Sequence, residues 1–217
     1  NRALHWYKKA AEQGDARGQR SLGKMYDIGR GVPEDDAIAV YWYKKAAEQG
    51  DATAQSNLGG MYEYGEGVAK DVNKAVFWYE KAAEQGHARG QRYLGKMYDI
   101  GRGVAKDYTK AVYWYKKAAE QGDASGQSSL GTMYLYGEGV AKDYTEAVYW
   151  YKKAAEQGND RAQYNLGTMY LYGEGVAKDY TKAIHWYKKA AEQGHASAQN
   201  NLASRYFNGE GVAKDVN

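Results

Sequence analysis

The sequence contains no cysteine, a single proline and only two phenylalanines among its 217 residues. The lack of cysteine excludes disulfides, thiol catalysis and cysteine-ligated metals. No apolar run approaches the length that crosses a bilayer, so no membrane insertion is expected. The formal net charge is +3, which is too small to predict binding to nucleic acid.

Large aliphatic residues are also scarce, since Leu, Ile, Val and Phe together number 27. That is below the share that usually indicates a packed core. The nearly balanced charge nevertheless argues against disorder. Twenty-three tyrosines, six tryptophans and many alanines supply the apolar surface instead. This composition favours helices packed closely around large rings.

An internal repeat organises the chain. The six tryptophans, Trp6, Trp42, Trp78, Trp114, Trp150 and Trp186, follow one another at intervals of 36 residues. One copy is "DASGQSSLGTMYLYGEGVAKDYTEAVYWYKKAAEQG", residues 123–158. The period predicts a single domain over 1–217, made of a partial copy at 1–14, full repeats at 15–50, 51–86, 87–122, 123–158 and 159–194, and a partial repeat at 195–217.

Each copy predicts two helices, here called helix A and helix B. In the second copy helix A spans about 52–64, with Asp51 as its N-cap and Gly65 at the left-handed position that ends it. Helix B follows, with Asp71 as its N-cap, and it reaches about Gln85 before Gly86 ends it.

The copies differ on one side of helix A only. The positions of Ala52, Gln55, Leu58, Gly59, Met61 and Tyr62 barely change, whereas those of Thr53, Ser56, Asn57, Gly60, Glu63 and Tyr64 vary. At about 100° per residue these two sets lie on opposite faces, a packing face and a variable face. Gly59 is mid-helix, where glycine costs about 1 kcal/mol, which predicts the close approach of a bulky ring from a neighbouring helix.

Helix B shows a similar division. An apolar arc of Ala75, Val76, Trp78, Tyr79, Ala82 and Ala83 is expected to be buried, whereas Lys74, Glu80, Lys81 and Glu84 face solvent.

The spacing A-x-A/G-Q-x-x-L-G-x-M-Y-x-x-G-x-G-V, followed by the Trp and the double Ala, resembles the Sel1-like repeat, a relative of the tetratricopeptide repeat. The resemblance covers the whole chain. It implies an all-α, right-handed α-α superhelix (solenoid) of about six 36-residue helix-turn-helix repeats, with the A helices lining the concave side. It also implies a bacterial adaptor or scaffold for protein complexes, with a periplasmic or secreted location typical of many members. Unlike the cysteine-rich branch, this chain has no disulfide.

Chemistry is not expected from this pattern. The four histidines occupy two repeat positions and lack the spacing of a ligand pair, so no metal is predicted. The "GEGVAKD" loops lack the signature of a phosphate-binding loop, and no cofactor is predicted. Almost every acid, hydroxyl and lysine recurs as a near-copy, whereas catalysis needs an asymmetric set of groups. An enzyme related to the cell wall is the weaker alternative.

The variable face of helix A is the predicted partner-binding surface. Its first and third copies are mainly basic, and its fourth and fifth copies are apolar and aromatic. This order predicts a groove for a protein or peptide segment with an acidic part and an apolar part. The alternative is that the charges are solvated or form internal ion pairs of little energy. The candidate residues are Arg17, Arg20, Lys24, Asp27, Asn57, Glu63, Arg89, Arg92, Tyr93, Lys96, Asp99, Leu135, Tyr136, Tyr164, Leu171, Tyr172, Asn200 and Phe207.

The ends of the chain lie at the same phase of the repeat. The sequence starts within a repeat and without Met, which indicates a fragment, and its last helix A precedes no further helix B. Head-to-tail self-association is therefore expected, with the N-terminal helix of one molecule on the last repeat of another; a frayed end is the alternative. An engineered or self-assembling structural repeat without a dedicated ligand is a further alternative.

Overall fold

The computed structural model describes residues 2–210, and this part of the chain is entirely helical, with twelve α-helices and no strand. The predicted all-α class is confirmed. The helices are α1 (Arg2–Glu12), α2 (Ala16–Asp27), α3 (Asp36–Glu48), α4 (Ala52–Tyr64), α5 (Val72–Glu84), α6 (Ala88–Ile100), α7 (Tyr108–Glu120), α8 (Ala124–Tyr136), α9 (Tyr144–Glu156), α10 (Asp160–Tyr172), α11 (Tyr180–Glu192) and α12 (Ala196–Asn208). Even-numbered helices are of type A and odd-numbered helices of type B.

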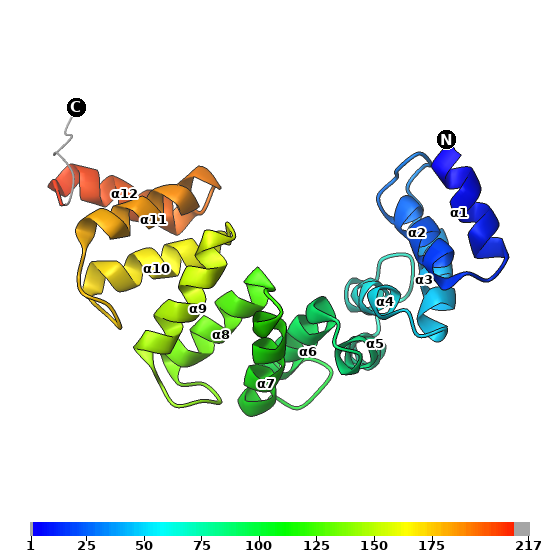
Figure 1. Ribbon diagram of the computed structural model, residues 1–217, viewed down its shortest axis with the longest axis horizontal. Helices are drawn as coiled ribbons and strands as arrows, with labels where there is room; N and C mark the ends of the chain where they lie inside the picture. The colour runs from blue at the N-terminus through cyan, green and yellow to red at the C-terminus, as the bar shows by residue number, and fades with distance from the viewer. Residues whose placement is uncertain (1, 211–217) are drawn as a thin grey trace. The chain divides into compact units, whose positions relative to one another are not determined.

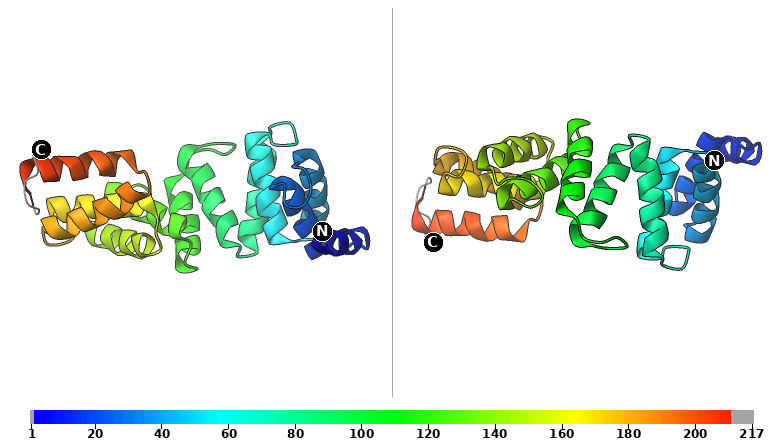
Figure 2. Two further views of the ribbon diagram at one scale, coloured as in Figure 1. Left: turned by 90° about the horizontal axis from the view of Figure 1, so that it is seen from above. Right: turned by 90° about the horizontal axis from the view of Figure 1, so that it is seen from below.

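The chain divides into two compact units, residues 1–117 and 118–217, and the boundary falls within α7. In the first unit each helix from α1 to α6 packs on the next, and α4 also contacts α6. In the second unit α8 to α12 pack in the same sequential way (Figures 1 and 2). The prediction of a single domain stays a prediction.

The helix ends follow the predicted capping chemistry. The Asp51 carboxylate accepts a hydrogen bond from the Ala54 amide at 2.8 Å, and Asp71 accepts from Lys74 at 3.1 Å. Gly65 adopts the left-handed conformation, with φ of 81°. Because each cap satisfies amides or carbonyls that the helix leaves open, the sequence defines these boundaries locally.

A tyrosine ring explains the mid-helix glycine that recurs in five copies of helix A. A Cβ atom on Gly59 would lie 2.6 Å from the Tyr79 ring, which is closer than any carbon contact allows. The same clash would occur in the other complete repeats, between the pairs Gly23 and Tyr43, Gly95 and Tyr115, Gly131 and Tyr151, and Gly167 and Tyr187. The predicted approach of a bulky ring is confirmed, and the ring belongs to helix B of the same repeat.

The tryptophan of the apolar arc that was predicted to be buried in helix B is buried in one copy only, at Trp150. Tyr79 is fully buried, whereas Trp78 is only partly buried and Trp6 is 64% exposed. The two side chains are one residue apart, so they point about 100° apart around the helix. The tyrosine enters the glycine gap of helix A. The tryptophan lies at the edge of the packing face, where it meets the preceding ring edge-on, as Phe77 and Trp78 do.

A buried glutamine joins successive helices. Gln55 donates from its amide to the Ala47 carbonyl at 3.0 Å and accepts from Gln85 at 2.7 Å. Its side chain therefore links α4 to the preceding and the following type B helix. The same pair of bonds recurs at Gln19, Gln127 and Gln163. The glutamine that recurs on the packing face is thus a buried polar residue whose side chain both donates and accepts hydrogen bonds.

Candidate functional site

The candidate residues lie on the type A helices, as the repeat predicted. In the first unit they are Arg17, Arg20, Lys24 and Asp27 on α2, Asn57 and Glu63 on α4, and Arg89, Arg92, Tyr93, Lys96 and Asp99 on α6. In the second unit they are Leu135 and Tyr136 on α8, Tyr164, Leu171 and Tyr172 on α10, and Asn200 and Phe207 on α12.

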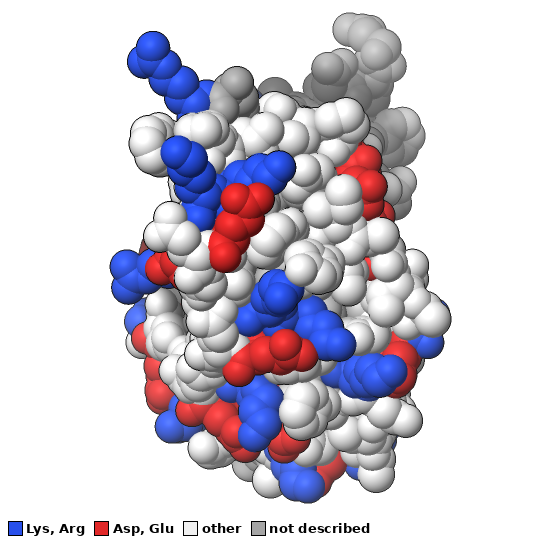
Figure 3. Space-filling model, turned by 90° about the vertical axis from the view of Figure 1, so that its right-hand side faces the viewer, with Lys and Arg blue, Asp and Glu red and all other residues white. Residues whose placement is uncertain are grey.

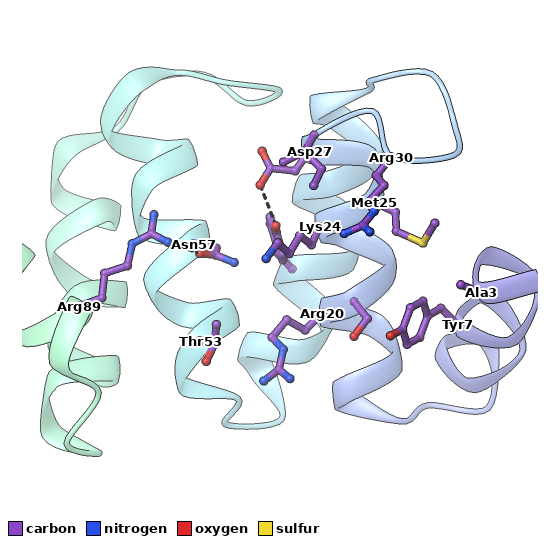
Figure 4. Close-up of a pocket in the computed structure, with 13 residues that line it drawn as sticks. Ala3, Tyr7, Arg20, Lys24, Met25, Asp27, Arg30, Thr53, Asn57 and Arg89 are labelled. Carbon is purple, nitrogen blue, oxygen red and sulfur yellow. Dashed lines mark hydrogen bonds between the residues drawn. The ribbon is translucent and has the colours of Figure 1, made fainter. Parts of the chain in front are cut away.

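A cavity of about 970 Å³ brings five of these residues together in the first unit. They come from three type A helices, and α1 contributes a further wall (Figure 4). The five are Arg20, Lys24, Asp27, Asn57 and Arg89. Thr53, which the sequence places on the variable face, also lines the cavity. Sequence reasoning missed the remaining lining residues, which are Ala3, Tyr7, Ser21, Met25, Ile28, Arg30 and Tyr43. Arg30 could have been found from the sequence, because its position in the loop varies between copies: two copies have Arg there and the others have Glu.

An acid and a phenol lie side by side in the cavity. The Tyr43 hydroxyl donates to Asp27 at 2.8 Å, the bond drawn in Figure 4. Burial raises the pKa of the Tyr43 phenol, and the adjacent Asp27 carboxylate raises it further. The phenol therefore stays protonated and serves as a hydrogen-bond donor, not as a base.

The four cations of the cavity are not equally engaged. Arg20 forms an ion pair with Asp51 at 2.8 Å, and Arg89 donates to the Asn57 amide oxygen at 3.3 Å. The side chains of Lys24 and Arg30 are exposed and form no hydrogen bond or ion pair within residues 2–210. In the cavity, Arg20 and Arg89 thus bond to other side chains of the protein, whereas Lys24 and Arg30 are open to a ligand.

The prediction that Glu63 belongs to the partner-binding surface was wrong, because its side chain is fully buried. Its carboxylate accepts from Tyr79 at 2.8 Å and pairs with Lys96 and Arg102, both at 3.1 Å. Although partial burial opposes the shift, the Glu63 carboxylate raises the pKa of Lys96. Lys96 and Glu63 are therefore structural partners across two repeats. Ser56, on the same variable face, is also fully buried.

The other polar candidates on α6 are also engaged within the protein. Asp99 accepts from the Tyr115 hydroxyl at 3.1 Å. Tyr93 stacks on Tyr79, and the Arg92 guanidinium lies 4.2 Å from the Tyr93 ring centroid. The alternative of internal ion pairs and contacts therefore holds for part of this surface.

The apolar candidates of the second unit divide into buried and exposed side chains. Leu171 is buried in a cluster with Ala183 and Tyr187, so it is a core residue and its inclusion in the surface was wrong. Leu135 is half-buried, and Tyr164 stacks on His195.

The exposed members are led by Tyr136 and Tyr172, at 66% and 67%; Asn200 and Phe207 are also exposed. The two tyrosines are the last residues of α8 and α10.

Residues 2–210 contain no group of three or more His, Asp or Glu side chains placed to hold a metal ion. Among the same residues, no helix combines the length and apolar character that a membrane span requires. Lysines, arginines and acids alternate on the face shown in Figure 3, and neither sign dominates it.

These features define the class: an α-helical repeat protein built of antiparallel A and B helix pairs. The chain belongs to the Sel1 repeat family, whose repeat matches residues 1–15, 16–51, 52–87, 88–123, 124–159, 160–195 and 196–217. Members of this family are generally non-catalytic protein-interaction scaffolds. No curated protein matches the chain.

Solved structures show the same fold. A protective antigen of uropathogenic Escherichia coli, described as displaying an SLR fold, is 43% identical with a TM-score of 0.88 over 98% of this chain and 45% of that one. A Sel1 repeat protein from Oxalobacter formigenes is 41% identical, with a TM-score of 0.86 over 94% of this chain and 81% of that one. The present chain thus spans less than half the length of the Escherichia coli antigen.

Proposed function

We propose that the chain is a protein-interaction scaffold whose type A helices bind an acidic protein segment at the cavity of the first unit. The carrying observation is the composition of that cavity, in which Arg20, Lys24, Arg30 and Arg89 face a single acid, Asp27. Arginines and aromatic rings in a concave site are the usual energetic centres of protein recognition. The family's general role in protein interaction supports the proposal.

The second unit supports binding of an apolar segment on its own type A helices. Tyr136 and Tyr172 are exposed and occupy equivalent positions one repeat apart. Tyrosine supplies a large contact area with little loss of conformational entropy, and its hydroxyl stays hydrated.

A library of random peptides displayed on phage, selected against residues 1–217, tests the proposal. Selected peptides should be rich in Asp and Glu. Arg89→Glu should weaken them about ten-fold, because the guanidinium lies in the cavity and is exposed. The control is Lys45→Glu, which makes the same change of charge at an exposed site on α3. Absence of acidic enrichment, or equal losses in the two variants, would count against the proposal.

Head-to-tail self-association stays a prediction for this 217-residue chain. Leu202 of α12 is only partly buried, whereas its counterparts, such as Leu58 and Leu94, are fully buried. Sedimentation velocity over a wide range of concentration tests it. A Leu202→Glu variant should then remain monomeric where the unmodified chain associates.

A further inference from the structure

The N-caps of the type A helices are of two chemical kinds. Those of α2, α4 and α8 are aspartates and that of α10 is an asparagine: Asp15, Asp51, Asp123 and Asn159. Both kinds of side chain accept hydrogen bonds at any pH above about 5. The N-caps of α6 and α12 are histidines instead, His87 and His195. Two helices of the chain thus begin at a group that titrates near neutral pH.

The geometry of His87 determines which ring nitrogen carries a proton. Nδ1 accepts a hydrogen bond from the Gly90 amide at 3.1 Å, as the Asp51 carboxylate accepts one from Ala54 in α4. Because a ring nitrogen that accepts from an N–H carries no hydrogen, the capping imidazole is neutral and its hydrogen is on Nε2. Nε2 lies 3.4 Å from the Thr53 hydroxyl of α4, to which it can donate. One ring therefore caps α6 and contacts the neighbouring type A helix.

A second proton on the His87 ring is incompatible with this cap. A protonated Nδ1 would direct its hydrogen at the Gly90 N–H, and two donors cannot form a hydrogen bond with each other. The added charge would also lie at the N-terminus of a helix, where the helix dipole disfavours cations. Arg89, two residues further on, is a like charge that opposes it as well. Acid therefore favours a form in which the first turn of α6 has lost its cap.

The other charged side chains at this end of the neighbouring helices have partners or are exposed. They form the bonded pairs Asp51 with Arg20 at 2.8 Å, Glu84 with Lys81 at 3.7 Å, and Arg89 with the Asn57 amide oxygen at 3.3 Å. Near the end of α7, the side chains of Lys116, Lys117 and Glu120 are exposed. The helix in contact with the ring, α4, presents the uncharged Thr53 to it. Between about pH 5 and 8, His87 is the group among these whose charge changes.

We infer that His87 is a pH-sensitive cap, which releases the first turn of α6 when the imidazole gains a second proton. The cap lies beside the cavity of the first unit, because Thr53 and Arg89 both line that cavity (Figure 4). Once released, the first turn no longer holds Arg89 in its place on the cavity wall. The inference goes beyond the proposed function and does not depend on it, since the cap involves no ligand.

The direction of the effect follows from proton binding. The capped form of α6 needs an unprotonated Nδ1, whereas a histidine in a released segment takes up a proton near about pH 6.5. The capped form therefore has its full stability above about pH 7.5 and becomes less stable as the pH falls below about 6.5. One pH unit below that value, the ratio of released to capped form should be about ten-fold higher.

Amide hydrogen exchange measured by NMR between about pH 7.5 and 5.5 tests the inference. After correction for the intrinsic exchange rate, the protection of the Gly90 amide should fall about ten-fold in acid. The Ala54 amide is an internal control, because the carboxylate of Asp51 caps it and keeps its charge over this range. Its protection should therefore stay constant.

The matched variant is His87→Asn, since Asn159 makes the same cap bond in α10 at 2.9 Å. The variant should fold, as circular dichroism would verify, and the protection of its Gly90 amide should be independent of pH. A second variant, His185→Asn, removes an exposed histidine of α11 and should keep the full loss in acid. Constant Gly90 protection in the unmodified chain, or an equal loss in His87→Asn, would overturn the inference.

Discussion

The Tyr79 hydroxyl donates a 2.8 Å hydrogen bond to the Glu63 carboxylate, and both side chains are fully buried. The bond belongs to a pattern within the chain. In the first and third repeats the equivalent phenol donates to Asp27 or Asp99. In the fourth and fifth repeats a leucine, Leu135 or Leu171, occupies the position of the acid. The phenol there forms a hydrogen bond with a threonine instead, Thr132 or Thr168. A buried phenol needs a partner, and the chain supplies one in two ways.

Replacing Glu63 with leucine should be destabilising, because it leaves the Tyr79 hydroxyl without an acceptor and removes the anion between Lys96 and Arg102. The expected cost is about 2 kcal/mol. The double variant Gly60→Thr with Glu63→Leu installs the solution of the fourth repeat. A Cβ atom at Gly60 would lie 3.7 Å from the Tyr79 oxygen, so the threonine has room.

Urea denaturation followed by circular dichroism measures both variants. The double variant should recover at least half of the loss. If it is no more stable than Glu63→Leu alone, the exchange of one phenol partner for the other is not the reason for the pattern.

Two adjacent glycines of α4 should respond in opposite directions to alanine. Gly59→Ala places a methyl group 2.6 Å from the Tyr79 ring, so overpacking should cost about 1–3 kcal/mol. Gly60→Ala meets only the Tyr79 oxygen at 3.7 Å and should gain up to about 1 kcal/mol of helix propensity. The midpoints of urea unfolding should lie on either side of that of the unmodified chain. Stabilisation by both substitutions would contradict the assigned ring contact.

The buried tyrosines should make the protein unstable in alkali. Burial raises the pKa of Tyr43, Tyr79, Tyr151 and Tyr187 in the folded protein. The unfolded chain releases these protons near the ordinary value of about 10, while the folded chain retains them. The free energy of unfolding therefore has its full value below about pH 10 and falls as the pH rises above it.

Urea midpoints measured across this pH range test the effect. Tyr79→Phe should reduce the slope of stability against pH above about pH 10, because one titrating group is removed. An unchanged slope would show that Tyr79 does not contribute.

Asp51 should stabilise the fold through two interactions, as the N-cap of α4 and as the ion-pair partner of Arg20 in the cavity. Asp51→Ala removes both interactions and should cost about 1–2 kcal/mol. Asp51→Asn keeps the cap, since Asn159 caps α10 with a 2.9 Å bond, and loses only the ion pair. Thermal unfolding should rank the unmodified chain first, the Asn variant second and the Ala variant last. Equal loss in the two variants would assign the whole effect to the charge.

The fold was predictable from local signals. Asp51, Gly65 and Asp71 define helix ends through hydrogen bonds to residues nearby in the sequence. Gly59 predicts contact with a large ring, although the sequence does not show which ring it is. The candidate surface was predicted less well. Glu63 and Lys96 were placed among the exposed residues because the sequence shows that they vary between copies, and variation does not distinguish a solvated pair from a buried one.

The sequence by itself determined the period, the two helices of each repeat, their caps and the face that each helix buries, because these depend on spacing within one helix. The tertiary structure decided that the tyrosine and not the tryptophan fills the glycine gap. It also decided that Glu63 is buried, and that Lys24 and Arg30 are open to a ligand. These outcomes depend on side chains from other helices, such as Lys96, which is 33 residues from Glu63. Packing in three dimensions, not helical periodicity, determines which of two chemically similar groups finds a partner.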